Sequence, residues 1–180
     1  MNLIAFAASN SRASINKQLV THAAQVFATD IAPGTAVEIL DLNDYEMPIY
    51  SIDREQADGI PPLAQAFMDK MASADALLIS YAEHNQSVTV AYKNIVDWAS
   101  RIDRNIFGLR PTVMLSTSPG GRGAKTALAY ATENAERFGV DLKASLSIGN
   151  FHTVFDTDKG ELTDEGVTAS LKAALSHLAP

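Results

Sequence analysis

Residues 2–8 read Asn-Leu-Ile-Ala-Phe-Ala-Ala, and residues 9–16 continue as Ser-Asn-Ser-Arg-Ala-Ser-Ile-Asn. The first segment is apolar almost throughout, which is typical of a parallel strand that is covered on both faces. The second segment is polar, and it leads into residues 15–29, where apolar side chains recur at helical spacing. A buried strand, a polar loop and an amphipathic helix predict the first unit of an α/β fold.

The rest of the chain repeats this alternation. We predict further strands over residues 36–42, 75–81, 112–116 and 140–148, and further helices over residues 61–73, 88–104 and 124–138 and from about Thr163 onward. The pattern predicts a three-layer sandwich in which helices cover both faces of a five-stranded parallel sheet, with strand order 2-1-3-4-5. No repeat divides the chain, so we expect residues 1–180 to form a single domain.

Composition narrows the function. The net charge is −7, which disfavours binding to the phosphate backbone of nucleic acids. The chain has no cysteine, and its four histidines are scattered, so we expect no metal site. No segment is long and apolar enough for a membrane helix, and the start lacks the basic residues of a signal peptide. We therefore expect a cytoplasmic protein that needs no membrane.

In a sheet with this order, ligands bind beyond the carboxyl ends of the strands, where the strand order reverses. The loops after strands one, three and four therefore matter most. In the first, hydroxyl and amide side chains precede a helix whose free N–H groups can bind phosphate, and Arg12 can supply a full positive charge. The alternative is that Ser14 only caps the helix.

The other two loops are also suited to a ligand. Residues 82–87 are polar, and their backbone amides could contact a flat heterocycle. Within them His84 is either an ordinary loop histidine or an acid, a stacking group or a cap. Residues 116–123 include three glycines, which allow a close approach of the backbone to a ligand. Neither a Walker A loop nor a dinucleotide fingerprint fits this segment, and no Gly-x-Ser-x-Gly elbow occurs in the chain.

At these loops the chain resembles the flavodoxin-like NAD(P)H-dependent FMN reductases, which include flavin, quinone, azo-dye and chromate reductases. Their first pattern, Gly-Ser-x-Arg-x-x-Ser-x-Asn, is matched within residues 8–16, with Ala8 in place of the glycine and Arg12 one place late. Their second, Pro-Glu-Tyr-Asn-x-Ser and then Lys-Asn-x-x-Asp-Trp, is matched at 82–87 and 93–98, with Ala82 for proline and His84 for tyrosine. Their third, Ser-x-Ser-Pro-Gly-Gly, is residues 116–121.

The resemblance implies which residues would bind FMN. The phosphate would be held by Ser9, Ser11, Arg12, Ser14 and Asn16. The isoalloxazine ring would be bordered on one side by Ala82, Glu83, His84, Asn85 and Ser87, largely through backbone groups, and on the other by Ser116, Ser118, Gly120 and Gly121. No side chain is assigned with certainty to catalysis, because hydride transfer takes place at FMN; His84 is the one candidate.

The resemblance further implies a ping-pong reductase, in which NAD(P)H reduces FMN and a flavin, quinone or similar small molecule then accepts the electrons. It implies a homodimer or homotetramer with the flavin near the interface. Residues 45–61 form a long connection that could be a wall of the acceptor pocket, part of an interface or a surface loop. Two alternatives stay open: an FMN-binding electron carrier that does not use NAD(P)H, and a non-enzymatic binding protein that has lost flavin.

Overall fold

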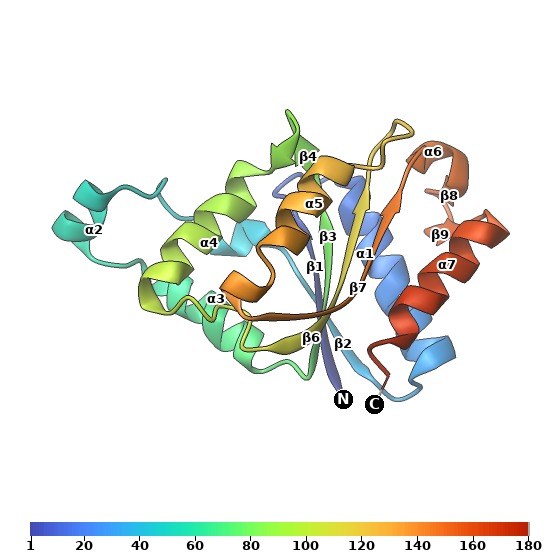
Figure 1. The fold of residues 1–180 in the computed structure, drawn as a ribbon, viewed down its shortest axis with the longest axis horizontal. Helices are drawn as coiled ribbons and strands as arrows, with labels where there is room; N and C mark the ends of the chain where they lie inside the picture. Colours follow the sequence, from blue (N-terminus) through green and yellow to red (C-terminus); the bar gives the residue numbers. More distant parts are fainter. Residues whose placement is uncertain (180) are drawn as a thin grey trace.

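Five parallel strands form the central sheet of the computed structural model, which describes residues 1–179 (Figure 1). The strands are β1 (Asn2–Ala8), β2 (Ala36–Leu40), β3 (Ala76–Tyr81), β6 (Arg110–Thr117) and β7 (Val140–Ile148). They lie in the order β2-β1-β3-β6-β7, and every neighbouring pair is parallel. The predicted order 2-1-3-4-5 is confirmed.

Helices cover both faces of this sheet (Figure 1). The helices α1 (Ile15–Val26) and α7 (Glu165–Ser176) pack on one face, and α3 (Pro62–Ala72), α4 (Val90–Ile102) and α5 (Lys125–Glu133) pack on the other. Successive residues of β1 enter the two cores alternately: Leu3 joins the core under α1 and α7, whereas Ile4 joins the other. Both faces of β1 are thus buried, which explains why its sequence is apolar throughout.

Several short elements were not predicted. They are the 3-10 turns Leu42–Tyr45 and Glu136–Phe138, the π-helical turn Phe27–Ile31, the helices α2 (Ile52–Asp58) and α6 (Phe151–Val154), and two hairpins, β4 (Glu83–His84) with β5 (Ser87–Val88) and β8 (Phe155–Asp156) with β9 (Glu161–Leu162). The helix predicted over 88–104 begins later because the first hairpin includes Val88. The helix predicted over 124–138 ends earlier, at Glu133. Two-residue strands and helices of one or two turns are too short to show a hydrophobic period.

The strands that precede the three predicted loops end side by side. In the parallel register Ala8 pairs with Tyr81, and Tyr81 pairs with Ser116. The loops that follow β1, β3 and β6 therefore start at one level along the same edge of the sheet. The strand order also reverses at this edge, between β1 and β3, which is where open α/β sheets bind their ligands.

His22 joins α1 to the hairpin of β8 and β9. The Leu162 N–H donates to His22 Nε2 at 3.4 Å, and the imidazole packs edge-on against Phe155, with 5.8 Å between ring centroids. Partial burial lowers the pKa of His22 below its ordinary 6.5, although the nearby carboxylates Glu161 and Asp30 act to raise it. The folded state therefore favours the neutral imidazole, which is the form that accepts this hydrogen bond.

We expect stability to depend on pH through His22. The unfolded chain takes up the proton near pH 6.5 and the folded chain only at lower pH, so the free energy of unfolding should fall as pH drops below 6.5. The loss should be complete once pH is below the pKa of the folded state. Denaturant unfolding from pH 7.5 to 5 measures it. His22→Gln should flatten this part of the profile.

Candidate functional site

The loop after β1 is shaped by its own serines. Ser9 Oγ accepts a hydrogen bond from the Ser11 N–H at 3.2 Å, and Ser14 Oγ accepts one from the Lys17 N–H at 3.3 Å. Ser14 is thus the N-cap of α1, while Ser11 and Arg12 are exposed at the surface of the loop. The first N–H groups of a helix have no intrahelical partner, so this loop surrounds a set of free donors at the positive end of α1. Such a loop can bind a phosphate.

Asn16 is buried behind this loop, with only 2% of its surface exposed. Its side-chain carbonyl accepts hydrogen bonds from Ser80 Oγ at 2.7 Å and from the Thr117 N–H at 3.1 Å, and its amide donates to the Thr117 carbonyl at 3.1 Å. One side chain thus joins the start of α1 to the ends of β3 and β6. These bonds make Asn16 a support of the loop, and the contact with phosphate that the resemblance implies for it stays a prediction.

Thr117 lies at the same place and was not among the predicted site residues. Its backbone is bonded to Asn16, and the residue is 1% exposed. Its hydroxyl is buried and has no hydrogen-bond partner within residues 1–179. A buried hydroxyl without a partner is costly unless a bound group completes it. The only signal in the sequence was its position between Ser116 and Ser118.

An ion pair joins the first turn of α1 to the end of β2. Lys17 Nζ lies 2.5 Å from Asp41 Oδ2. The bond from Lys17, together with the N–H of Asn43, lowers the pKa of Asp41 to about 2. Asn43 in turn donates from its amide to the Asn10 carbonyl at 3.1 Å. The segment after β2 is therefore held against the first loop.

Residues 83–88 after β3 form the hairpin of β4 and β5, not an open loop. Asn85 and Gln86 at its turn have φ angles of 51° and 62°, the left-handed pair that a tight two-residue hairpin requires. His84, Asn85 and Ser87 are exposed on this hairpin, whereas Ala82 at its base is buried. The predicted ring-binding residues thus lie on a short projection at the edge of the sheet.

Thr89 fixes the base of the hairpin. Its hydroxyl donates to the Ala8 carbonyl at 2.9 Å and accepts from the Tyr92 N–H at 3.2 Å, so it caps α4 and ties it to the end of β1. Tyr81 and Tyr92 pack edge-on beside it, with their hydroxyls 3.4 Å apart. Burial raises the pKa of Tyr92 to about 12 and that of Tyr81 well above 10, so both phenols stay neutral.

Hydrogen bonds from its own serines and from the loop after β7 hold the glycine-rich loop after β6. Ser116 Oγ donates to the Gly123 carbonyl at 2.6 Å, and Ser118 Oγ donates to the Gly120 carbonyl at 3.0 Å. The loop after β7 adds a bond from the Asn150 N–H to the same Gly120 carbonyl at 3.0 Å. Gly120 and Gly121 remain exposed, so their backbone can contact a ligand. The hydroxyl of Ser116 is used within the loop.

A cavity of about 210 Å³ adjoins the first loop and the hairpin. Its lining combines apolar side chains with a few polar ones: Asn10, Leu42, Asn43, Tyr45, Glu46, Met47, Ile49, His84, Thr89, Val90, Ala91, Asn94 and Ile95. Most of one wall comes from residues 42–49. Of these, Tyr45, Glu46, Met47 and Ile49 belong to the long connection 45–61, for which the sequence allows a pocket wall, an interface or a surface loop. Part of that connection is thus a pocket wall in the structure.

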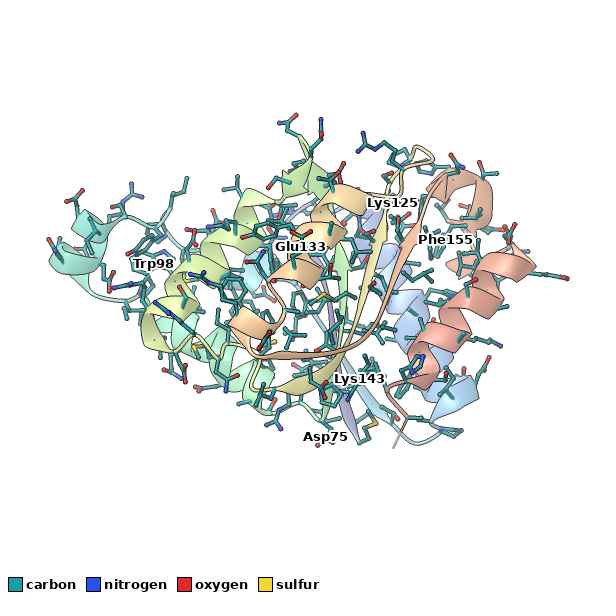
Figure 2. The ribbon with its side chains drawn as sticks, in the orientation of Figure 1. Asp75, Trp98, Lys125, Glu133, Lys143 and Phe155 are labelled. Atoms are coloured by element: carbon teal, nitrogen blue, oxygen red, sulfur yellow. The ribbon has the colours of Figure 1, made fainter. Side chains whose placement is uncertain are left out.

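Asn94 and Trp98 on α4 hold this wall in place. The Asn94 amide donates to the Met47 carbonyl at 3.0 Å, and its carbonyl accepts from the Tyr50 N–H at 2.8 Å. The Trp98 indole N–H donates to the Pro48 carbonyl at 2.7 Å. Figure 2 shows Trp98 on the side of α4 toward the arm that carries α2. The Lys-Asn-x-x-Asp-Trp pattern of the sequence therefore positions a wall through its asparagine and tryptophan.

Two other kinds of feature do not occur in residues 1–179. No group of three or more His, Cys, Asp or Glu side chains is placed to hold a metal ion. No helix in this range is long and apolar enough to cross a lipid bilayer.

The sequence is similar to those of known flavin and quinone reductases. Residues 1–153 match the family model described as NADPH-dependent FMN reductase. A probable NADPH:quinone oxidoreductase of Oryza sativa is 32% identical, over 99% of this chain and 90% of its own length. An NAD(P)H-dependent FMN reductase of Pseudomonas aeruginosa is 29% identical, over 82% of this chain and 79% of its own length.

Solved structures are similar over nearly the whole chain. The NAD(P)H:(acceptor) oxidoreductase FerB of Paracoccus denitrificans has a TM-score of 0.77 at 24% identity, with 98% of this chain and 94% of that chain covered. An FMN-dependent NADH-azoreductase of Bacillus anthracis, solved with FMN, has a TM-score of 0.68 at 13% identity, with both chains covered in full. At these identities the likeness concerns the fold.

Proposed function

The chain belongs to the NADPH-dependent FMN reductase family and is an NAD(P)H-dependent FMN oxidoreductase, and from this premise we propose how its residues serve that activity. The first loop holds the FMN phosphate, and the hairpin and the glycine-rich loop border the ring. The observation that supports this most strongly is the meeting of the three loops at one level, where the strand order reverses.

The residues present fit FMN. The N-terminal N–H groups of α1, together with Arg12 and the hydroxyls of Ser9, Ser11 and Ser14, suit a phosphate. The buried hydroxyl of Thr117, which has no partner in residues 1–179, lies beside Asn16 at the same edge and can be completed by a bound group. The backbone of the exposed residues Gly120, Gly121, His84 and Asn85 suits a flat ring. Asn16 and Ser116 support these groups from behind.

Bound FMN would supply the redox chemistry, the transfer of two electrons and a proton from the nicotinamide to the acceptor, and the three loops would hold it for that transfer. The protein's part is to align the two partners and to exclude water from between them. The cavity beside the first loop and the hairpin lies next to the proposed flavin and can receive the partner molecules. Its apolar wall, with Met47 and Ile49, suits a flat apolar molecule such as a quinone or a flavin.

His84 is the only histidine among the described residues that line this cavity. Its imidazole is exposed and can donate a hydrogen bond or a proton to an oxygen of the acceptor. Since one cavity serves both partners in turn, we propose a ping-pong sequence in which the oxidised nicotinamide leaves before the acceptor binds. A homodimer or homotetramer, a cytoplasmic location and one domain over residues 1–180 complete the proposal.

The first experiment measures flavin binding and its dependence on the phosphate. The purified chain is titrated with FMN and with riboflavin while flavin fluorescence is followed. FMN should bind at least tenfold more tightly, because only FMN carries the phosphate. In Arg12→Ala this preference should shrink several-fold, whereas Arg104→Ala, at an exposed arginine beyond α4, should keep it. An equal preference in both variants would contradict the proposed phosphate site.

Steady-state oxidation of NADPH with a benzoquinone then tests the reaction. We expect parallel lines in double-reciprocal plots, the pattern of a ping-pong mechanism. Lines that intersect would show that both substrates bind together. Bound FMN without NADPH or NADH oxidation would favour the electron carrier, and failure to bind FMN would favour the non-enzymatic alternative.

A further inference from the structure

The helix α5 lacks a cap of its own. Its N-cap residue, Ala124, has φ 59° in the left-handed region, and within residues 1–179 no neighbouring side chain in the sequence caps it. The N–H groups of Thr126 and Ala127, which have no partner within the helix, donate instead to Glu83, a residue that precedes β6 in the chain. Both N–H groups donate to the same carboxylate oxygen, Glu83 Oε2, at 3.0 Å.

These two bonds connect two different parts of the site. Glu83 is the first residue of the β4–β5 hairpin, and α5 follows the glycine-rich loop, close to Lys125 at the top of the sheet in Figure 2. Among residues 1–179 they are the only hydrogen bonds between residues 82–88 and residues 118–127. The rest of the hairpin and the rest of the glycine-rich loop are each bonded to other neighbours.

The bond also fits the charges. A carboxylate is stabilised at a helix N-terminus by the partial positive charge there and by bonds from the free N–H groups. The glycine-rich loop cannot supply such a group, because its residues 119–124 are Pro, Gly, Gly, Arg, Gly and Ala. Glu83 therefore takes up the N-terminus of α5, whereas the N-terminus of α1 stays available for an anion.

We propose that Glu83 is a positioning residue that sets the distance between the hairpin and the glycine-rich loop. This inference rests on the proposed function, in which those two segments border the flavin ring on opposite sides. Without the carboxylate, the hairpin and the start of α5 lose the two hydrogen bonds that join them. The distance between the hairpin and the glycine-rich loop is then no longer fixed. Glu83 thus acts on flavin binding through α5, without itself having to touch the flavin.

The test compares Glu83→Ala with a matched capping variant. Asp164 is also a carboxylate that caps a helix: it is the N-cap of α7 and accepts from the Val167 N–H at 2.8 Å, and within residues 1–179 it makes no hydrogen bond to the three loops. Both Glu83→Ala and Asp164→Ala should lower the unfolding temperature of the flavin-free protein, because each removes a helix cap. Only Glu83→Ala should raise the dissociation constant of FMN, by at least tenfold, and alter the visible circular dichroism of the bound flavin.

The conservative variant separates positioning from general damage. Glu83→Gln keeps an oxygen that can accept from Thr126 and Ala127, so its FMN affinity should return to within about threefold of the original chain. If Glu83→Ala does not fold, Glu83→Gln and Glu83→Asp carry the comparison, with weaker binding expected for the shorter side chain. An FMN affinity that is unchanged in Glu83→Ala, or reduced equally in Asp164→Ala, overturns the proposal.

A readout without flavin distinguishes this proposal from the proposed function. In the flavin-free protein, Glu83→Ala should speed amide hydrogen exchange both at the start of α5 and in the hairpin, because the two segments are held together. Faster exchange at α5 alone would overturn the role of Glu83 as a link. If the original chain binds no FMN, the proposed function fails, and the exchange pattern still decides whether Glu83 joins the two segments.

Discussion

Asn16→Ala should be among the most damaging substitutions in this chain. It removes three buried hydrogen bonds and leaves the Ser80 hydroxyl and the Thr117 N–H and carbonyl without their partner. Buried polar groups left in this way cost about 1–3 kcal/mol each unless the structure relaxes around them. We expect a loss of about 3 kcal/mol in the free energy of unfolding, or an unfolding temperature lower by roughly 10 °C.

The same variant should also bind FMN more weakly. Asn16 is the second residue of α1, and its bonds to β3 and β6 fix the start of the helix that we propose as the phosphate site. We expect the dissociation constant of FMN to rise at least tenfold, which corresponds to about 1.4 kcal/mol. Thermal unfolding without flavin and a fluorescence titration measure the two effects separately.

Asn134→Ala is the matched control. Asn134 makes one side-chain bond, to the Tyr130 carbonyl at 2.8 Å, at the end of α5 and in a half-buried position. Its loss should cost about 1 kcal/mol or less and leave FMN affinity unchanged. Equal effects of Asn16→Ala and Asn134→Ala would show that the bonds of Asn16 to β3 and β6 contribute no more to stability or FMN affinity than a single bond within a helix.

Gly123→Ala should be comparably harmful, for a steric reason. Gly123 has φ 62°, and a Cβ atom added there would lie 2.3 Å from Ser147 Oγ and 2.9 Å from the carbonyl carbon of Ile148. Ser147 could turn away only by giving up its bond to the Gly123 carbonyl, and Ile148 belongs to the backbone of β7. We expect a loss of about 3 kcal/mol from the overpacking and the unfavourable φ together.

Gly160→Ala isolates the steric part of this effect. Gly160 also has a positive φ, 72°, but a Cβ atom there would meet nothing within 4 Å. This variant should therefore lose only the conformational part, about 1 kcal/mol. Chemical denaturation of the two variants measures the difference. If both lose the same amount, close packing of the glycine-rich loop against β7 is not what requires Gly123.

Periodicity in the sequence was enough to predict the architecture. Strands buried on both faces, such as Leu3 to Ala8, are apolar without interruption, and the helices between them are long enough to show their period. With right-handed crossovers these elements allow few strand orders, and the predicted one is confirmed. The three loops near the sheet edge followed from this order and from their hydroxyl-rich and glycine-rich composition.

The roles of individual polar residues could not be read in the same way. From the sequence, Asn16 can be either a phosphate ligand or a buried support, because a side-chain amide is suited to both roles. Only its short distances to Ser80 and Thr117 in the structure show that it supports the loop. The resemblance implies that Glu83 borders the ring, largely through its backbone, and only the structure shows that its carboxylate caps a helix that begins 42 residues later. The hairpin was missed because its turn, Asn85-Gln86, lacks the glycine that usually marks it.

By itself the sequence determined the layers, the strand order and the edge of the sheet where a ligand can bind, because hydrophobic period and chain connectivity are local properties of the chain. Only the tertiary structure decided which polar side chains face that edge and which support it from behind. Asn16, Glu83 and Asn94 each satisfy backbone or side-chain groups that lie tens of residues away. Such partners are brought together by the packing of helices on the sheet, and no spacing along the chain encodes them.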